Sequence, residues 1–405
     1  MRLLWLCVLV PTAQSSLVDW LLRRKEEPLP PRLEPVASVD IRQFFANDDV
    51  PGLHHALDDF FWRTARRPGP LENALPLRPA LISKGAGNTY SSAYKLDHDV
   101  EQLEYLSSRL NETDVPKAAF LRDVVLPRFR RVRARIPPLT ELEKTGGLWG
   151  FRPNDAAEIG DFYNRALHLP DPEPVVDMLG KGFADPSALA SEYASSSVLV
   201  VDDALSSEAF AQIRDLLLES TVFFETKMPL RFGAYVGAIV EDGLHARAFL
   251  KLADALKKQL PELLGGHELA YLWAYKYDAD LAAGIKVHAD EAAVNVNLWL
   301  TPDDANLESD SGGLVVYTAR PENAATAEDY NARGEEYAAT LLEKSKYANV
   351  TVPYKANRAV IFDSALFHKT ASIRFKRGYA NRRINLTLLF GTMQKGPTPA
   401  KAKDL

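Results

Sequence analysis

The sequence has a single cysteine, Cys7, among 405 residues. Cys7 lies in an apolar N-terminal stretch that follows Arg2 and leads into small polar residues. This pattern is typical of a secretory signal peptide, and we predict that residues 1–16 form one. The processed chain then contains no cysteine, which excludes disulfides, thiolate metal sites and cysteine nucleophiles. The predicted location is the secretory pathway, either the ER lumen or the cell exterior.

The sequence also lacks a basic excess and a long apolar run. Its 48 Lys and Arg residues stand against 54 Asp and Glu residues, a net charge of −6. This balance argues against a dedicated nucleic-acid binder, so we expect no nucleic-acid partner. After the first residues, no stretch is long and apolar enough to span a bilayer. We therefore expect no membrane anchor once the signal peptide is removed.

Composition and periodicity change along the chain. Apolar residues recur at helical spacing between Leu96 and Leu110, whereas short β-branched and aromatic runs alternate with turn signals from Ala270 onward. The predicted fold class is α+β. The predicted segments after the signal peptide are a Pro-rich linker (17–39), a mainly helical region (40–190), a β-rich domain (196–392) and a flexible tail (393–405).

Two histidines and one carboxylate form a candidate metal site. In an extended strand, residues two apart point to the same side, so His288 and Asp290 can present their side chains to one point. His368 is the candidate for a third ligand. Two imidazoles and a carboxylate that leave open positions suit Fe(II) and oxygen chemistry. A lone His-x-Asp is common by chance, so this interpretation depends on the sequence around it.

The order of the surrounding motifs resembles a known family. A strand-like run follows Asp290, Gly312-Gly313 precedes another, a third leads into His368, and Arg383 begins a fourth. Over about residues 196–392 the sequence is similar to the 2-oxoglutarate/Fe(II)-dependent dioxygenase superfamily, in its prolyl 4-hydroxylase-like branch. The resemblance implies a double-stranded β-helix (jelly roll), with iron held at its mouth by His288, Asp290 and His368.

The resemblance also implies a cation for the distal carboxylate of 2-oxoglutarate. Arg383 is the chosen residue, because a guanidinium binds a carboxylate bidentately and stays charged when it is desolvated. Its neighbour Arg382 would point to the opposite face of the strand, while Arg374 and Lys376 compete for the role. The further cosubstrate-binding candidates are Tyr275 and Tyr277, which strand packing explains equally well, and Trp299.

The interval from Asp290 to His368 is longer than is typical of this branch. We attribute the excess to a charged, helix-like insertion around residues 321–346.

The function implied by the resemblance is hydroxylation of a C–H bond, with Fe(II), 2-oxoglutarate and O2 required and ascorbate as a reductant. Together with the predicted signal peptide, the resemblance points to a prolyl or other residue of a secreted-pathway protein as the substrate. A small-molecule substrate remains an alternative. Two alternatives remain: a jelly-roll module that binds without catalysis, and a cupin-like metal enzyme that does not use 2-oxoglutarate. The presence of all the metal ligands argues against the first, and Arg383 argues against the second.

Overall fold

The computed structural model describes residues 39–63, 90–281, 285–318 and 334–392. The predicted signal peptide, the predicted tail and nearly all of the predicted linker lie outside these residues. The described residues from 39 onward belong to one compact unit. None of the described helices is long and apolar enough to cross a bilayer.

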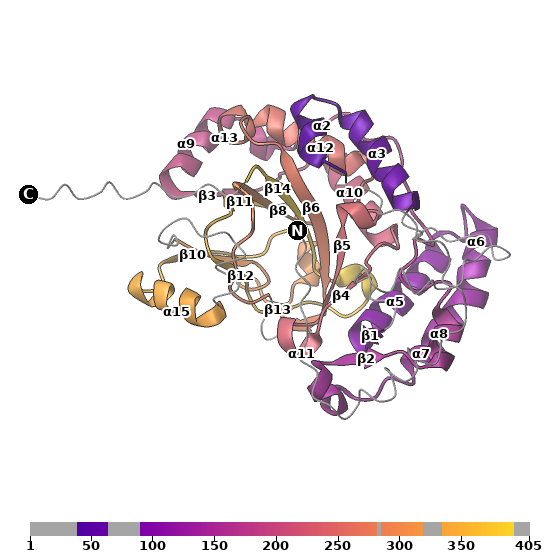
Figure 1. Ribbon diagram of the computed structural model, residues 1–405. Helices are drawn as coiled ribbons and strands as arrows, with labels where there is room; N and C mark the ends of the chain where they lie inside the picture. The colour runs from indigo at the N-terminus through magenta and orange to yellow at the C-terminus, as the bar shows by residue number, and fades with distance from the viewer. Residues whose placement is uncertain (1–38, 64–89, 282–284, 319–333, 393–405) are drawn as a thin grey trace, which may run out of the picture. The chain divides into compact units, whose positions relative to one another are not determined.

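A seven-stranded antiparallel sheet is the largest element of the structure (Figure 1). Its strands, in spatial order, are β3 (Val198–Val201), β11 (Ala359–Asp363), β8 (Val294–Trp299), β14 (Ile384–Phe390), β6 (Leu269–Tyr277), β5 (Tyr235–Ile239) and β4 (Glu225–Thr226). Every residue of β8 and of β14 is buried, because both faces of the sheet are covered at its centre. The register places Thr387 opposite Asn297 on one side and Trp273 on the other.

A smaller antiparallel sheet faces one side of the cavity described below. In it, β9 (Leu314–Tyr317) lies between β10 (Asn349–Val352) and β12 (His368–Thr370). A separate strand pair joins β7 (Asp280–Leu281) to β13 (Ile373–Arg374). A large and a small antiparallel sheet are what the predicted jelly roll requires. The predicted insertion includes helix α15 (Gly334–Lys344), and residues 319–333 lie outside the described part.

Amphipathic helices bury their apolar faces in the same core as the large sheet. Helix α12 (Arg247–Gln259) turns Leu252 and Leu256 inward and keeps its lysines outward. These helices, grouped beside β5 and β6 in Figure 1, are α2 (Ile41–Ala46), α3 (Val50–Arg63), α10 (Ser207–Glu219) and α12. The other helices of this part of the chain are α9 (Pro186–Ser196), α11 (Pro229–Phe232) and α13 (Pro261–Leu264).

A second apolar cluster is built from helices that precede the large sheet in the sequence. They are α5 (Ala93–Arg109), α6 (Val115–Phe120), α7 (Leu126–Arg133) and α8 (Pro153–Ile159), next to the antiparallel strand pair of β1 (Tyr90–Ser92) and β2 (Leu148–Gly150). Ser92 caps the N-terminus of helix α5, and its hydroxyl accepts a hydrogen bond from the Lys95 amide. Buried polar contacts join α5 to the large sheet, since the Tyr94 hydroxyl donates to the Lys276 carbonyl at 2.9 Å.

An ion-pair cluster ties the end of β3 to the turn before β11. Asp202 accepts hydrogen bonds from Arg358 Nε at 2.6 Å and from Lys355 Nζ at 2.9 Å. The hydrogen bond from Arg358, followed by that from Lys355, outweighs burial and lowers the pKa of Asp202 to about 2. Because this value lies below the ordinary 3.8, the stabilisation is present above about pH 4 and is lost as the pH falls through about 2.

We expect Asp202→Asn to lower the melting temperature at neutral pH, because it removes the charge that Arg358 and Lys355 share. The difference from the wild type should be constant between about pH 5 and 7 and should narrow below about pH 4. Scanning calorimetry across this range measures it. Asp203→Asn is the matched control, since the ion-pair partner of Asp203 among the described residues is the exposed Lys181. Equal melting temperatures for Asp202→Asn and wild type at pH 7 would contradict the expectation.

Candidate metal centre

The two histidines of the predicted site lie on neighbouring extended segments that hydrogen-bond to each other. The His288 amide donates to the His368 carbonyl at 3.1 Å, and the His368 amide donates to the His288 carbonyl at 2.8 Å. This pairing sets the two imidazole rings side by side, with their centroids 4.3 Å apart. Asp290 follows two residues after His288, and its amide donates to the carbonyl of Ser364. Backbone pairing thus brings together two ligands that lie far apart in the sequence.

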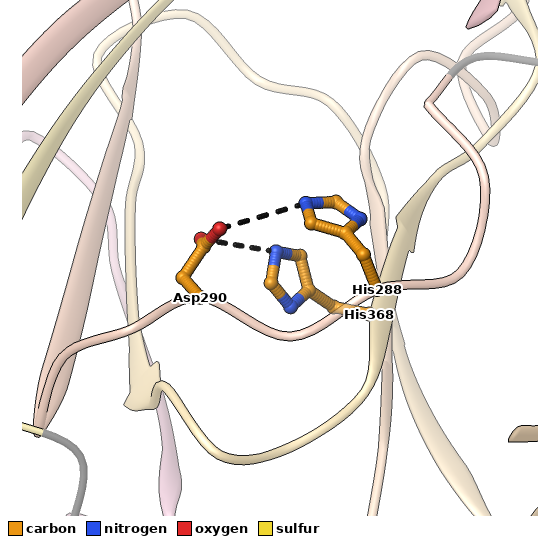
Figure 2. Close-up of side chains that lie close together, drawn as sticks. All are labelled: His288, Asp290 and His368. Carbon is orange, nitrogen blue, oxygen red and sulfur yellow. Dashed lines mark ion pairs between the residues drawn. The ribbon is translucent and has the colours of Figure 1, made fainter. Parts of the chain in front are cut away.

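The three side chains converge on one point, as Figure 2 shows. Asp290 Oδ1 lies 3.7 Å from His288 Nε2, and Asp290 Oδ2 lies 3.4 Å from His368 Nε2. One donor atom from each residue falls within 4.8 Å of the others. Donor atoms bound to adjacent positions of one ion at about 2.1 Å lie roughly 3 Å apart. A divalent ion therefore fits among them after small side-chain adjustments.

Backbone carbonyls fix which nitrogen of each imidazole faces the centre. Nδ1 of His288 lies 2.8 Å from the Lys286 carbonyl, and Nδ1 of His368 lies 3.1 Å from the Leu366 carbonyl. A carbonyl oxygen only accepts, so each Nδ1 carries the hydrogen and each Nε2 keeps its lone pair. Metal-binding histidines are oriented in the same way.

The charges of the site also fit a metal ion. Burial, followed by the nearby imidazole of His368, lowers the pKa of His288 to about 4, so His288 is neutral at pH 7 and free to donate its lone pair. Burial acts to raise the pKa of Asp290, but the nearby imidazoles and the hydrogen bond from Asn295 outweigh it and the pKa falls below its ordinary value. The centre offers two imidazoles and an ionised carboxylate, the set that suits non-haem Fe(II).

A cavity of about 190 Å³ opens from this centre between the large and the small sheet. The three metal-site residues and Arg383 are the charged or titratable members of its lining, apart from tyrosines. The rest of the lining is aromatic, aliphatic or neutral and polar, from β6 (Trp273, Tyr275, Tyr277), β8 (Asn297), β14 (Asn385, Thr387) and their surroundings (Tyr235, Ile285, Leu314, Thr370). Arg383, Asn385 and Thr387 lie two residues apart along the extended chain and share the cavity face.

Arg383 is a buried cation with unused hydrogen-bonding capacity. Its side chain lies among the rings of Tyr277, Trp299 and Tyr354, with the guanidinium carbon 4.8, 5.6 and 5.7 Å from their centroids. Nε donates to the Gly312 carbonyl, whereas Nη1 has no partner among the described residues. An unpaired buried charge is costly, so an anion bound in the cavity would satisfy it. A carboxylate fits this requirement, as the predicted role of Arg383 demands.

The Gly312-Gly313 turn brings the Gly312 carbonyl, which accepts from Arg383, close to that side chain. Gly312 has φ +74°, a left-handed conformation that favours glycine. At Gly313, a Cβ atom would lie 1.9 Å from the Val352 carbonyl oxygen, so only glycine allows the close approach of β10.

The remaining predicted residues are placed as follows. Tyr275 and Tyr277 both line the cavity. Trp299 is fully buried and stacks on Tyr354 with centroids 5.2 Å apart, so it stands behind Arg383 and outside the cavity lining. The competing cations point elsewhere, because Arg374 pairs with Glu308 at 2.9 Å and Lys376 pairs with Asp304 at 3.0 Å, all four being well exposed.

Sequence reasoning missed two contributors to the site. Tyr354 lies in the loop after β10 and hydrogen-bonds through its hydroxyl to both backbone groups of Thr301. Thr370 ends β12 two residues after His368 and lines the cavity. The period-two rule could have found Thr370, because it shares a strand face with His368. No local pattern distinguishes Tyr354.

No family model and no curated protein sequence matches the chain. Several solved structures are similar to it. The non-haem α-ketoglutarate-dependent epimerase SnoN from nogalamycin biosynthesis is 16% identical, with 54% of this chain and 93% of that one covered and a TM-score of 0.38. A Pseudomonas putida prolyl-4-hydroxylase is also 16% identical, with 52% of this chain and 100% of that one covered and a TM-score of 0.34.

A third similar structure is HygX from Streptomyces hygroscopicus with nickel, 2-oxoglutarate and hygromycin B bound. It is 13% identical, with 51% of this chain and 86% of that one covered and a TM-score of 0.35. These likenesses are distant, and the function proposed below rests on the geometry of this chain's own residues.

We expect His368→Ala and Asp290→Ala to weaken Fe(II) or Co(II) binding by more than about 100-fold, since removal of even an outer-shell partner costs 10–100-fold. Isothermal titration calorimetry under anaerobic conditions measures the affinity. His55→Ala is the control, because His55 is exposed on α3 and should leave the affinity unchanged. Wild-type affinity in either ligand variant would show that these residues do not form the metal centre.

Proposed function

We propose that this protein is an Fe(II)- and 2-oxoglutarate-dependent dioxygenase that hydroxylates a C–H bond. One observation supports this function above the others. The cavity of about 190 Å³ combines a two-histidine, one-carboxylate centre with a buried guanidinium that has an unpaired N–H group. A metal site alone would need no such cation, and a structural arginine would be paired on all sides.

The residues divide between the two bound groups. His288, Asp290 and His368 would hold the iron, and Arg383 would receive the distal carboxylate of 2-oxoglutarate. When bound, iron and 2-oxoglutarate activate O2 for oxidation of the substrate, with ascorbate as a reductant that keeps the iron ferrous. The protein supplies positioning and keeps competing reactions out.

The surroundings of Arg383 strengthen its interaction with a carboxylate. The rings of Tyr277, Trp299 and Tyr354 surround the guanidinium and keep water away from it. Charge-assisted hydrogen bonds are stronger in such a low-dielectric setting. Tyr235, Tyr275 and Tyr277 line the same cavity and offer phenol groups to a bound cosubstrate.

The cavity also bears on the class of substrate. Apart from the metal ligands and Arg383, no lining residue carries a charge at neutral pH. Trp273 and Tyr275 are half-buried aromatic residues, and Tyr235 packs edge-on against Tyr275 at 5.0 Å. Such rings accept the apolar face of an uncharged group. The proposed substrate is a peptidyl residue of this kind, such as proline, in a protein of the secretory pathway, which the signal-like N-terminus supports.

The test measures succinate formed from 2-oxoglutarate by the purified protein with Fe(II) and ascorbate, with and without proline-containing peptides. We expect Arg383→Gln to raise the KM for 2-oxoglutarate by about 10- to 150-fold, which corresponds to the 1.5–3 kcal/mol of a hydrogen bond to a charged group. Arg374→Gln and Lys376→Gln are matched controls, because both side chains pair on the surface.

Three outcomes would move the assignment. A raised KM in Arg374→Gln but not in Arg383→Gln would relocate the cosubstrate anchor. Metal binding without 2-oxoglutarate binding would favour a cupin-like enzyme. Absence of both would leave the non-catalytic binding module.

A further inference from the structure

Four buried polar side chains cross the cavity face of the large sheet and end at the metal carboxylate. Asn295 and Asn297 lie two residues apart on β8, and Asn385 and Thr387 lie two apart on β14. Their exposed fractions are between 0% and 6%. Thr387 stands directly opposite Asn297 in the strand register. We call these four side chains the amide relay.

The hydrogen bonds of the amide relay all run in one direction. Asn295 Nδ2 donates to Asp290 Oδ2, and Asn297 Nδ2 donates to Asn295 Oδ1. Asn385 Nδ2 and Thr387 Oγ1 then donate to Asn297 Oδ1, at 2.9 and 3.0 Å. The direction follows from chemistry, because an ionised carboxylate can only accept and Asn295 must therefore turn its amide nitrogen toward Asp290. Each later amide is then oriented by the one before it.

The relay makes the two oxygens of Asp290 unequal. Oδ2 receives the hydrogen bond from Asn295 and lies 3.4 Å from His368 Nε2, whereas Oδ1 lies 3.7 Å from His288 Nε2 and receives no hydrogen bond from the described residues. A carboxylate that is free to rotate can bind an ion through both oxygens. The hydrogen bond from Asn295 occupies one lone pair of Oδ2 and fixes the plane of the carboxylate, so Oδ1 is the freer oxygen for the ion.

We propose that Asn295 is a positioning residue that holds Asp290 as a one-oxygen metal ligand, and that Asn297, Asn385 and Thr387 keep Asn295 in the required orientation. This inference rests on the proposed function, since it assumes that Asp290 binds a metal. Hydrogen-bond partners of metal ligands orient the ligand and tune the ion in this way.

A network that served folding alone would behave differently. Buried amides need partners, and backbone groups normally supply most of them. Here the relay passes its hydrogen bonds from side chain to side chain and ends on a metal-site carboxylate. A folding role predicts losses in thermal stability without a change in metal affinity. A positioning role predicts losses in affinity that become smaller with distance from Asp290.

The experiment measures Co(II) binding without 2-oxoglutarate, by calorimetry and by the visible absorption of the bound ion. We expect Asn295→Leu to weaken binding by about 10- to 100-fold, Asn297→Leu by less, and Thr387→Val least, because Asn385 still donates to Asn297 in that variant. The absorption of Co(II) should also decrease in intensity and shift in Asn295→Leu, because Asp290 becomes free to bind through both oxygens.

The matched control is Thr221→Val. Thr221 is also a buried hydroxyl, 8% exposed, and it bonds to both backbone groups of His168 outside the cavity lining. It should lower the melting temperature without changing Co(II) affinity or absorption. If Asn295→Leu does not fold, Asn297→Leu and Thr387→Val still test whether the loss of Co(II) affinity becomes smaller with distance from Asp290.

The outcomes separate the two proposals. Wild-type protein that binds Co(II), with unchanged affinity and spectrum in all three relay variants, would overturn the positioning role and leave the proposed function standing. Wild-type protein that binds no Co(II) would overturn both.

Discussion

The backbone pairing of His288 with His368 is the interaction on which the candidate site depends. Its two hydrogen bonds, at 3.1 and 2.8 Å, join a segment that follows β7 to strand β12 of the small sheet. Each such bond stabilises the fold by only about 0.5–1.5 kcal/mol. Their main effect is geometric, because they place two imidazoles side by side and carry Asp290 into position two residues later. This placement forms the metal centre, from which the cavity opens and at which the amide relay ends.

Two adjacent arginines show how the sheet divides its contacts. Arg383 enters the cavity, whereas Arg382 points to the other face, where it pairs with Glu101 of helix α5 at 2.9 Å and bonds to the Tyr94 hydroxyl at 3.0 Å. Two adjacent residues of one strand therefore contact the candidate cosubstrate pocket on one face and the helices that precede the large sheet on the other. The buried charge of Arg382 is paired, and Nη1 of Arg383 is left for a ligand. This contrast separates a structural cation from a binding one.

Local rules predicted the parts of the site that lie along a single strand. The two-residue period placed His288 with Asp290, and it placed Arg383 with Asn385 and Thr387 on one face. The same rule predicted that Arg382 points away from the cavity. Strand periodicity could not predict that its partner, Glu101, lies on a helix. A period of two also puts Trp299 on the same strand face as Asn295 and Asn297, yet Trp299 stacks on Tyr354 behind Arg383 rather than lining the cavity.

The sequence by itself determined the types of ligand, their pairing along each strand, and the absence of thiol chemistry in residues after Cys7. Only the tertiary structure decided which distant residues meet. It brought His368 beside His288, left Nη1 of Arg383 without a partner, turned Arg374 and Lys376 toward surface carboxylates, and directed four neutral polar side chains onto Asp290. The physical reason is that strand periodicity is a local property of the backbone. Burial, charge pairing and hydrogen-bond direction depend on the strands that fold against it.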